Sequence, residues 1–285
     1  ENLYNCYPWA RTVKVMNPLS SDLGVMRQTL LFGGLESIVR NVNRKARNLR
    51  FFEVGNVYHF DEERYTTESP IKAYQQRYHL ALWVTGHRVE GNWAHPDEES
   101  SFFELKAHVE NVLRRVGLQA GQVVTEASDN NIFDKGLRMK TRGGKVLVDM
   151  GIVNHHVLRR FDIEQPVYYA EIDWTELMKA TRKNCLLFQE LSKYPAVSRN
   201  LALLVDANVE FAQIEQIARQ TEKKLLKQVV LFDVYQGKNL PEGKKSYAVN
   251  FILQDESRTL TDKAIEAIMQ KLMKNLTTKL HAELR

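Results

Sequence analysis

The sequence predicts an α+β protein of two domains, one over residues 1–189 and one over residues 190–285, each built on an antiparallel sheet with helices. Along the whole chain, runs with helical three- and four-residue apolar steps alternate with β-branched and aromatic runs. At Phe188 to Pro195 the composition shifts and the pattern restarts, with Lys193-Tyr194-Pro195 typical of a linker. A length of 285 residues also favours about two domains.

The composition is that of a globular protein, with 44% hydrophobic and 26% charged residues and a net charge of +5. The positive charge suits a polyanionic partner. Cys6 and Cys185 have no neighbouring His or Cys, so neither a zinc site nor a disulfide framework is predicted, and we expect a reducing cytoplasmic compartment. No apolar run approaches 18 residues, so no membrane partner is expected. Because the chain begins without methionine, we expect a piece of a longer protein.

The stretch from Asn17 to Tyr58 predicts a turn, a long amphipathic helix, a basic connector and a strand. Asn17-Pro18 favours the turn, and Ser20, Ser21 and Asp22 are candidate N-caps. We expect a helix from Asp22 to Arg40, preceded by a short strand at Val13 to Val15. Gly33-Gly34 in its middle weakens an isolated helix, so we expect it to pack against something large. Its apolar face would comprise Met26, Leu30, Leu31, Leu35, Ile38 and Val39.

Three parts of this stretch carry a family resemblance: Asn17-Pro18-Leu19-Ser20, Met26-Arg27, and the strand Phe52-Glu53-Val54-Gly55-Asn56-Val57-Tyr58. They resemble the synthetase-like core of the β subunit of bacterial phenylalanyl-tRNA synthetase. The resemblance implies a class II aminoacyl-tRNA synthetase-like antiparallel sheet, with this helix and strand as its first two motifs. The first motif would form a subunit interface, for which the matching positions are Asn17, Met26, Arg27, Leu30 and Leu31.

The second motif binds ATP in active relatives, and here the sequence departs from it. The active pattern is Phe-Arg-x-Glu, but Phe51 stands two residues before Glu53, and Arg50 is one residue away. Side chains alternate along a strand, so Arg50 should point to the face opposite Phe51 and Glu53. The glycine-rich third motif is also absent, since the nearest candidate, Gly151 to Arg160, has a single glycine. We therefore predict no catalytic residues in this core.

The rest of the first domain predicts further strands and one helix. Tyr78 to Gly86 is apolar enough for a strand buried on both faces. Gly117 follows a predicted helix over Phe102 to Leu118, and Gly143-Gly144 predicts a hairpin turn. Further strands are predicted at Gly121 to Glu126, Lys145 to Val153 and Val167 to Ile172.

We expect no metal site. The acidic clusters at residues 61–63 and 97–99 lack the fixed ligand spacing of a cation site and are better explained as surface loops. No two histidines show the His-x-x-x-His spacing of a helical zinc site, and the neighbours His155 and His156 cannot face one ion from a helix or strand.

The second domain predicts the order β-α-β-β-α-β, which is the ferredoxin-like split unit. Its expected elements are a strand at Leu201 to Val205, a helix with Phe211, Ile214, Ile217 and Ala218 on one face, strands at Leu225 to Tyr235 and Ser246 to Leu253, a helix from Thr261, and a short strand at Ala282 to Arg285. The runs from Leu191 to Leu201, from Phe232 to Tyr235 and from Ala282 to Arg285 resemble the ferredoxin-fold anticodon-binding domain that closes the same β subunit. The family usually has aspartate where this chain has Asn200.

An aromatic side chain on a small sheet can stack an unpaired base, and nearby cations can hold phosphates. Tyr235 lies beside a lysine-bearing loop, which makes it a candidate for both roles, although it could equally pack while the lysines are merely solvated. The predicted tRNA-binding residues are Arg199, Tyr235, Lys238, Lys244, Lys245 and Arg258.

The resemblance implies a non-catalytic part of the β chain, which assembles with the α subunit in an α2β2 heterotetramer and binds the anticodon stem-loop of tRNA(Phe). ATP and Mg²⁺ would be used by the holoenzyme and not by this chain. Two alternatives remain: a class II-like ligase acting alone, which the missing arginine and glycine-rich motif disfavour, and a protein-interaction scaffold with no RNA role. DNA is not an expected partner.

Overall fold

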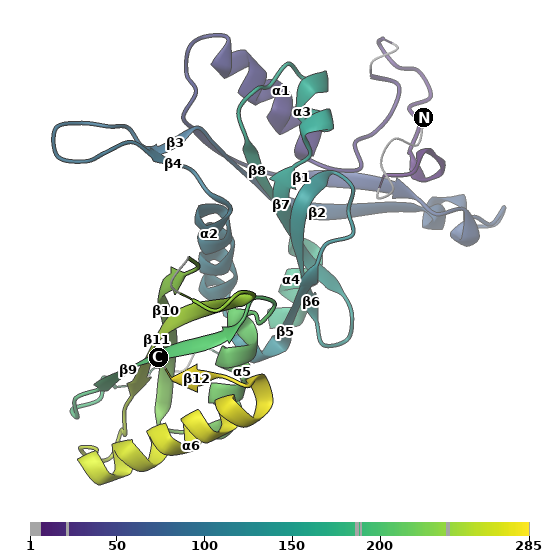
Figure 1. The fold of residues 1–285 in the computed structure, drawn as a ribbon. Coiled ribbons are helices and arrows are strands. Elements are labelled where there is room, and N and C mark those ends of the chain that lie inside the picture. Colours follow the sequence, from purple (N-terminus) through teal and green to yellow (C-terminus); the bar gives the residue numbers. More distant parts are fainter. Residues whose placement is uncertain (1–6, 21–22, 186–187, 189, 238–239, 285) are drawn as a thin grey trace. The chain divides into compact units, whose positions relative to one another are not determined.

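The computed structural model describes residues 7–20, 23–185, 188, 190–237 and 240–284 (Figure 1). The chain forms two compact units, residues 1–187 and 188–285, which we call the first unit and the second unit and describe separately.

The first unit is built on a six-stranded sheet in which every neighbouring pair is antiparallel. The strand order is β1-β2-β8-β7-β6-β5, so β1 forms one edge. The strands are β1 (Leu49–Phe60), β2 (Tyr74–Thr85), β5 (Val123–Ala127), β6 (Phe133–Thr141), β7 (Val146–Val153) and β8 (Val167–Asp173), with β3 (His87–Val89) and β4 (Glu98–Glu99) in a separate hairpin.

Helices cover both faces of this sheet, so the unit has two apolar cores. Side chains of α1 and α3 pack with Trp83 and Tyr169 on one face, and those of α2 and α4 pack with Val84 and Ile172 on the other. The helices are α1 (Leu31–Val42), α2 (Phe102–Arg115), α3 (His155–Arg160) and α4 (Trp174–Thr181), and short 3-10 turns occur at Trp9–Arg11, Glu62–Arg64, Pro70–Ala73 and Ala120–Gln122.

The helix predicted from Asp22 starts only at Leu31, so its expected first part is wrong. Residues 24–30 before it are irregular and not helical, because their backbone pairs elsewhere: Met26 N donates to Val13 O, and Tyr58 N donates to Arg27 O. The strand expected at Val13 to Val15 is likewise reduced to a single bridge, Lys14 with Val25. Tertiary hydrogen bonds thus override the helical spacing of Met26 and Leu30.

The expectation that Gly33-Gly34 packs against something large is confirmed for Gly34. A Cβ placed at Gly34 would lie 2.1 Å from the Trp83 indole, whereas one at Gly33 would meet no atom closer than 4.0 Å. Gly34 is therefore the residue that lets α1 approach the sheet, and Trp83 is almost fully buried beneath it.

Most other expected elements of the first unit are confirmed. Gly117 follows α2 with φ +82°, and Gly144 turns the β6–β7 hairpin with φ +81°. The short helices α3 and α4 and the β3–β4 hairpin were not predicted. Asn154 caps α3 and Asp173 caps α4 by accepting backbone N–H bonds.

The second unit confirms the predicted β-α-β-β-α-β order. Its four-stranded antiparallel sheet has the order β10-β11-β9-β12, and its core is formed with α5 and α6. Tyr247, Val249, Phe251 and Leu253 alternate inward along β11, as expected. The elements are β9 (Val197–Asp206), α5 (Phe211–Thr221), β10 (Leu226–Tyr235), β11 (Lys244–Leu253), α6 (Asp262–Leu280) and β12 (Glu283–Leu284).

Candidate functional site

Strand β1 carries the positions that would correspond to an ATP-binding motif. Arg50 lies on the face covered by α2, where it contacts Glu104 at 3.0 Å and donates to His87 O and Ser100 Oγ. Phe51 pairs in register with Trp83 and packs in the opposite core. The arginine and the glutamate of this strand therefore point to opposite faces, as the alternation predicts.

Glu53 has a partner from its own chain. Arg27 Nη1 lies 2.6 Å from Glu53 Oε1, and Arg27 Nε donates to Asn56 O at 3.0 Å. The guanidinium lies directly over Gly55, where a Cβ would come within 2.2 Å of Arg27 Nη2. Arg27, predicted at a subunit interface, thus occupies the surface beside the one motif glutamate that the strand retains.

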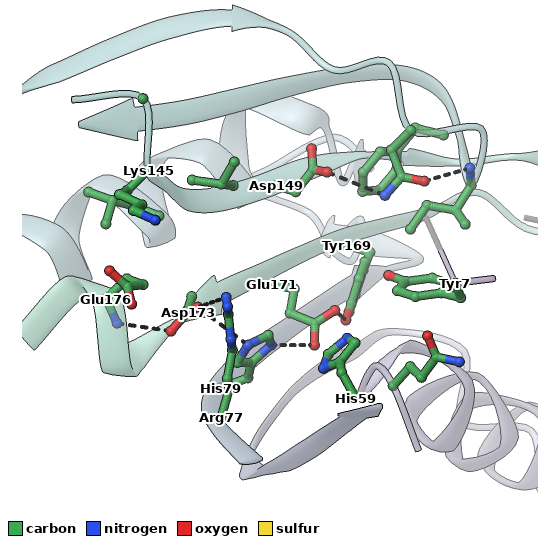
Figure 2. Close-up of a pocket in the computed structure, with 17 residues that line it drawn as sticks. Tyr7, His59, Arg77, His79, Lys145, Asp149, Tyr169, Glu171, Asp173 and Glu176 are labelled. Atoms are coloured by element: carbon green, nitrogen blue, oxygen red, sulfur yellow. Dashed lines mark hydrogen bonds and ion pairs between the residues drawn. The ribbon is translucent and has the colours of Figure 1, made fainter. Parts of the chain in front are cut away.

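The same face of the sheet carries a half-open pocket of about 410 Å³, entirely within the first unit (Figure 2). Side chains from β1, β2, β7 and β8 form its floor, and segments before α1 and around the β6–β7 turn form its walls. The labelled lining residues are Tyr7, His59, Arg77, His79, Lys145, Asp149, Tyr169, Glu171, Asp173 and Glu176.

Glu171 is the central group of this pocket, and all its hydrogen-bonding capacity is used internally. Its Oε1 accepts from Leu30 N at 3.2 Å and lies 2.9 Å from His79 Nδ1. Its Oε2 accepts from Thr29 Oγ1 and Tyr169 Oη, each at 2.7 Å. Burial by itself would raise the pKa of Glu171, but the hydrogen bonds from His79, Thr29 and Tyr169 outweigh it and lower the pKa.

The neighbouring groups of the pocket are also engaged or neutral. Asp173 caps α4 through Glu176 N and holds Arg77 at 3.2 Å. Burial, and then the charges of Arg77 and His79, lower the pKa of His59 to about 4, so its imidazole is uncharged at neutral pH. Asp149 lies 3.0 Å from Arg138.

One pocket group is unengaged: the buried Nδ1 of the neutral His59 has no hydrogen-bond partner among the described residues. The pocket carboxylates accept bonds from their own chain, and among the described residues no cluster of three His, Cys, Asp or Glu side chains could hold a metal ion. The pocket was not predicted, because Glu171, His79 and Asp173 come from two separate strands. The one available signal was a glutamate within the apolar run of β8.

The second unit does not bring the predicted tRNA-binding residues onto one surface. Arg199 pairs in register with the core residue Phe251, on the helix-covered face, and lies 3.7 Å from Asp262. Lys245 is only 8% exposed, with its ammonium 4.8 Å from the centroid of the Tyr247 ring. Arg258 lies in the loop before α6 and contacts Asp255 at 3.2 Å. Lys238 lies outside the described residues.

Tyr235 and Lys244 do lie on the other face of this sheet, which we call the open face because α5 and α6 pack against the opposite one. Lys244 contacts Glu283 of β12 at 2.8 Å. At the centre of the open face, Asn250 pairs with Asn200 in register and donates to it and to Ser198. Small and neutral polar side chains therefore form much of this face, and the amide pair was missed as a candidate.

The predicted subunit-interface residues divide into two groups. Leu30 and Leu31 are fully buried in the core under α1, so their side chains offer no surface to a partner. Asn17 is exposed and Met26 is half-buried. Met16 and Leu19, which were not predicted, are among the most exposed apolar residues described, at 92% and 96%.

Among the described residues, no helix is long and apolar enough to cross a bilayer.

Comparisons with known proteins agree with this organisation. A family described as the phenylalanyl tRNA synthetase beta chain CLM domain matches residues 2–174, and the ferredoxin-fold anticodon binding domain matches residues 192–285.

Relatives named phenylalanine–tRNA ligase beta subunit are similar over nearly the whole chain. That of Bacteroides thetaiotaomicron is 56% identical over 96% of this chain and 33% of its own length, and that of Bacteroides fragilis is 55% identical over 98% and 34%. That of Clostridium acetobutylicum is 32% identical over 96% and 32%. The chain thus spans about a third of the length of these relatives, and with the first family match covering more than half of its residues, it belongs to the phenylalanyl-tRNA synthetase β chain family.

Proposed function

We propose that this chain is the C-terminal part of the β chain of a phenylalanine–tRNA ligase, that it performs no chemistry itself, and that it supports subunit assembly and holds the anticodon stem-loop of tRNA(Phe). The observation that carries this proposal is the pair of matched domains, which cover both units in the order expected for that chain.

The contacts on β1 favour a non-catalytic role. Phe51 stands where an ATP-binding arginine would be needed, and Arg27 already neutralises Glu53. The arginines of that face, Arg27 and Arg77, already hold Glu53 and Asp173, so the triphosphate of ATP would compete with these carboxylates for them. ATP and Mg²⁺ are therefore assigned to the holoenzyme and activation of phenylalanine to the α subunit, with no cofactor held by this chain.

The open face of the second unit is the best candidate for RNA contact. A sheet face with small side chains lets bases approach the backbone, and the neutral amides of Asn200 and Asn250 can exchange hydrogen bonds with base edges. Tyr235 and Lys244 lie on the same face and supply an aromatic ring and a cation. Arg199 and Lys245, which lie on the helix-covered face, are assigned lesser roles.

The exposed apolar side chains of the first unit favour assembly with other chains. Met16, Leu19 and Leu23 lie in the segment before α1, and Phe52 is 75% exposed on the edge strand β1. Solvent-exposed apolar groups on a segment and an edge strand favour burial against a partner. We assign this surface to an α2β2 heterotetramer in the cytoplasm.

A titration of the chain with tRNA(Phe), beside the same tRNA with a scrambled anticodon, tests the RNA role at low and moderate salt. We expect salt-sensitive binding that weakens with the scrambled anticodon. Equal binding of both RNAs would contradict anticodon recognition by this chain.

A parallel titration with ATP and with phenylalanine tests the non-catalytic role. It should show no saturable binding, and binding of either compound would contradict that role.

The alternative is a protein-interaction scaffold without an RNA role, which the exposed apolar residues of the first unit also favour. It predicts no salt-sensitive tRNA binding, so the same titration separates the two functions.

A further inference from the structure

The last turn of α1 and the turn that follows it carry four cationic side chains that form no ion pair with any described residue. Arg40, Arg44, Lys45 and Arg47, which we call the basic turn, are all exposed, and no Asp or Glu occurs between Ser37 and Leu49. Several other arginines of the first unit, among them Arg27, Arg50, Arg77 and Arg138, lie within 3.2 Å of a carboxylate. Among the described residues, no ion pair involves a side chain of the basic turn.

The backbone of the basic turn is held in one conformation. Lys45 N donates to Val42 O and Ala46 N donates to Asn41 O, which closes the end of α1. Gln165 Nε2 donates to Arg47 O at 2.8 Å, and the Asn48 side chain accepts from His87 N. The four cations are thus presented on a fixed backbone, which lowers the entropy lost when they bind a partner.

Lys45 occupies a position where glycine is the stable choice. Its φ is +70°, in the left-handed region that closes helices and that side chains with a Cβ rarely adopt. Non-glycine residues held in this region carry a strain that is common at functional sites. A lysine here supplies charge to the basic turn and costs fold stability.

Compensation of the helix dipole does not account for this charge. The C-terminus of a helix carries roughly half a negative charge, which one nearby cation already balances. Glu36 lies on α1, Glu164 is next to Gln165, and Glu90 accepts a hydrogen bond from Asn48 Nδ2, but among the described residues none of the three forms an ion pair with the basic turn. A net positive surface therefore remains.

The chemistry of the basic turn favours a phosphate backbone over a protein surface. A protein interface needs apolar or aromatic anchors at its centre, and none of the exposed large apolar residues described lies between residues 36 and 48. Three of the four cations are arginines, whose planar guanidinium binds phosphate through two parallel hydrogen bonds.

We propose that the basic turn is a phosphate-binding surface for RNA, and that it gives the first unit its own, sequence-independent contact with the backbone of a bound tRNA. This inference rests on the proposed function, because it takes tRNA as the RNA. It adds a contact in the unit that the anticodon-binding match does not cover.

The test measures the salt dependence of tRNA(Phe) binding by the full chain. The logarithm of the binding constant falls linearly with the logarithm of the salt concentration, and each lost phosphate contact makes this negative slope shallower by about 0.7–0.9. We expect R44Q/R47Q to make the slope shallower by about 1.5. The variant should weaken binding equally for tRNA with the native and with the scrambled anticodon. The matched control is R114Q/R115Q, which removes two exposed arginines from the last turn of α2 and should leave the slope unchanged.

Lys45→Gly separates binding from folding. It removes the strained side chain, so we expect an unchanged or slightly raised Tm together with a salt slope that is shallower by about 0.8. A slope unaffected by both K45G and R44Q/R47Q, or an equal loss in R114Q/R115Q, would overturn the inference while leaving the proposed function standing. Absence of any tRNA binding by the wild-type chain at low salt would overturn both.

Discussion

The first unit covers both faces of its sheet with helices, whereas the second unit covers only one. At the centre of the first sheet, Glu171 accepts bonds from four groups of its own chain. At the centre of the second, Asn200 and Asn250 bond to each other on the open face. The difference indicates where each unit directs its polar groups: the first uses them to hold the fold together, and the second leaves them facing outward, where a ligand can reach them.

The largest expected effect comes from the carboxylate at the centre of the first unit. Glu171→Gln replaces an acceptor of four bonds by an amide that can accept only part of them, and leaves buried donors without partners. We expect a loss of about 3 kcal/mol in the free energy of unfolding of the first unit.

Urea unfolding followed by tryptophan fluorescence measures this loss selectively, because Trp9, Trp83, Trp93 and Trp174 all belong to the first unit. The control is Glu53→Gln, which removes the half-exposed pair with Arg27 and should cost less than about 1 kcal/mol. Equal losses for the two variants would contradict a structural role for Glu171.

The two adjacent glycines of α1 give a smaller but oppositely signed pair of effects. Gly34→Ala forces a methyl group into the Trp83 indole and should destabilise the first unit by about 2 kcal/mol. Gly33→Ala meets open space in the same helix and should stabilise it by about 0.5–1 kcal/mol. Fluorescence-monitored unfolding gives both values. Effects of the same sign would show that Trp83 does not limit how closely α1 approaches the sheet.

His59 predicts a pH dependence of the first unit. Its pKa is about 4 in the folded chain and near 6.5 when unfolded, so the folded state resists a proton that the unfolded state accepts. The free energy of unfolding is therefore unaffected by this group above about pH 6.5 and falls as the pH decreases toward 4. When the pH is lowered from 7 to 5, the free energy of unfolding of the first unit should fall by about 1–2 kcal/mol less in His59→Gln than in wild type, as measured by fluorescence-monitored unfolding at each pH. Parallel pH profiles of the two proteins would exclude a buried neutral imidazole.

The smallest effect sharpens the role of the open face. Glu283→Gln releases Lys244 from its carboxylate and should raise tRNA affinity about two- to threefold at low salt. Filter binding compares it with Glu215→Gln, which frees Arg219 on α5, on the helix-covered side, and should change nothing. A gain in the control alone would place RNA contact on the helices instead.

Local patterns in the sequence predicted most strands and the whole order of the second unit, because alternation along a strand such as β11 reports burial directly. They failed at α1, where Met26 and Leu30 keep helical spacing but the backbone of residues 26 and 27 pairs with distant segments. They failed also for Lys245, whose place in a basic loop suggested exposure while the register turns it inward. Both failures arise from contacts between residues far apart in the sequence.

The candidate site was less predictable than the fold. That Arg50 points away from the face shared by Phe51 and Glu53 followed from strand alternation alone. The bonds around Glu171 and the pair of Asn200 with Asn250 depend on sheet register, which no spacing within one segment reveals.

The contrast between a closed first sheet and an open second sheet is tested most directly by placing a carboxylate at the centre of the open face. Asn250→Glu should leave the fluorescence-monitored stability of the first unit unchanged and weaken tRNA(Phe) binding by about tenfold or more at low salt, because it adds negative charge where the RNA would lie. Unchanged tRNA binding in Asn250→Glu would contradict the account, since RNA would then be held elsewhere on the chain.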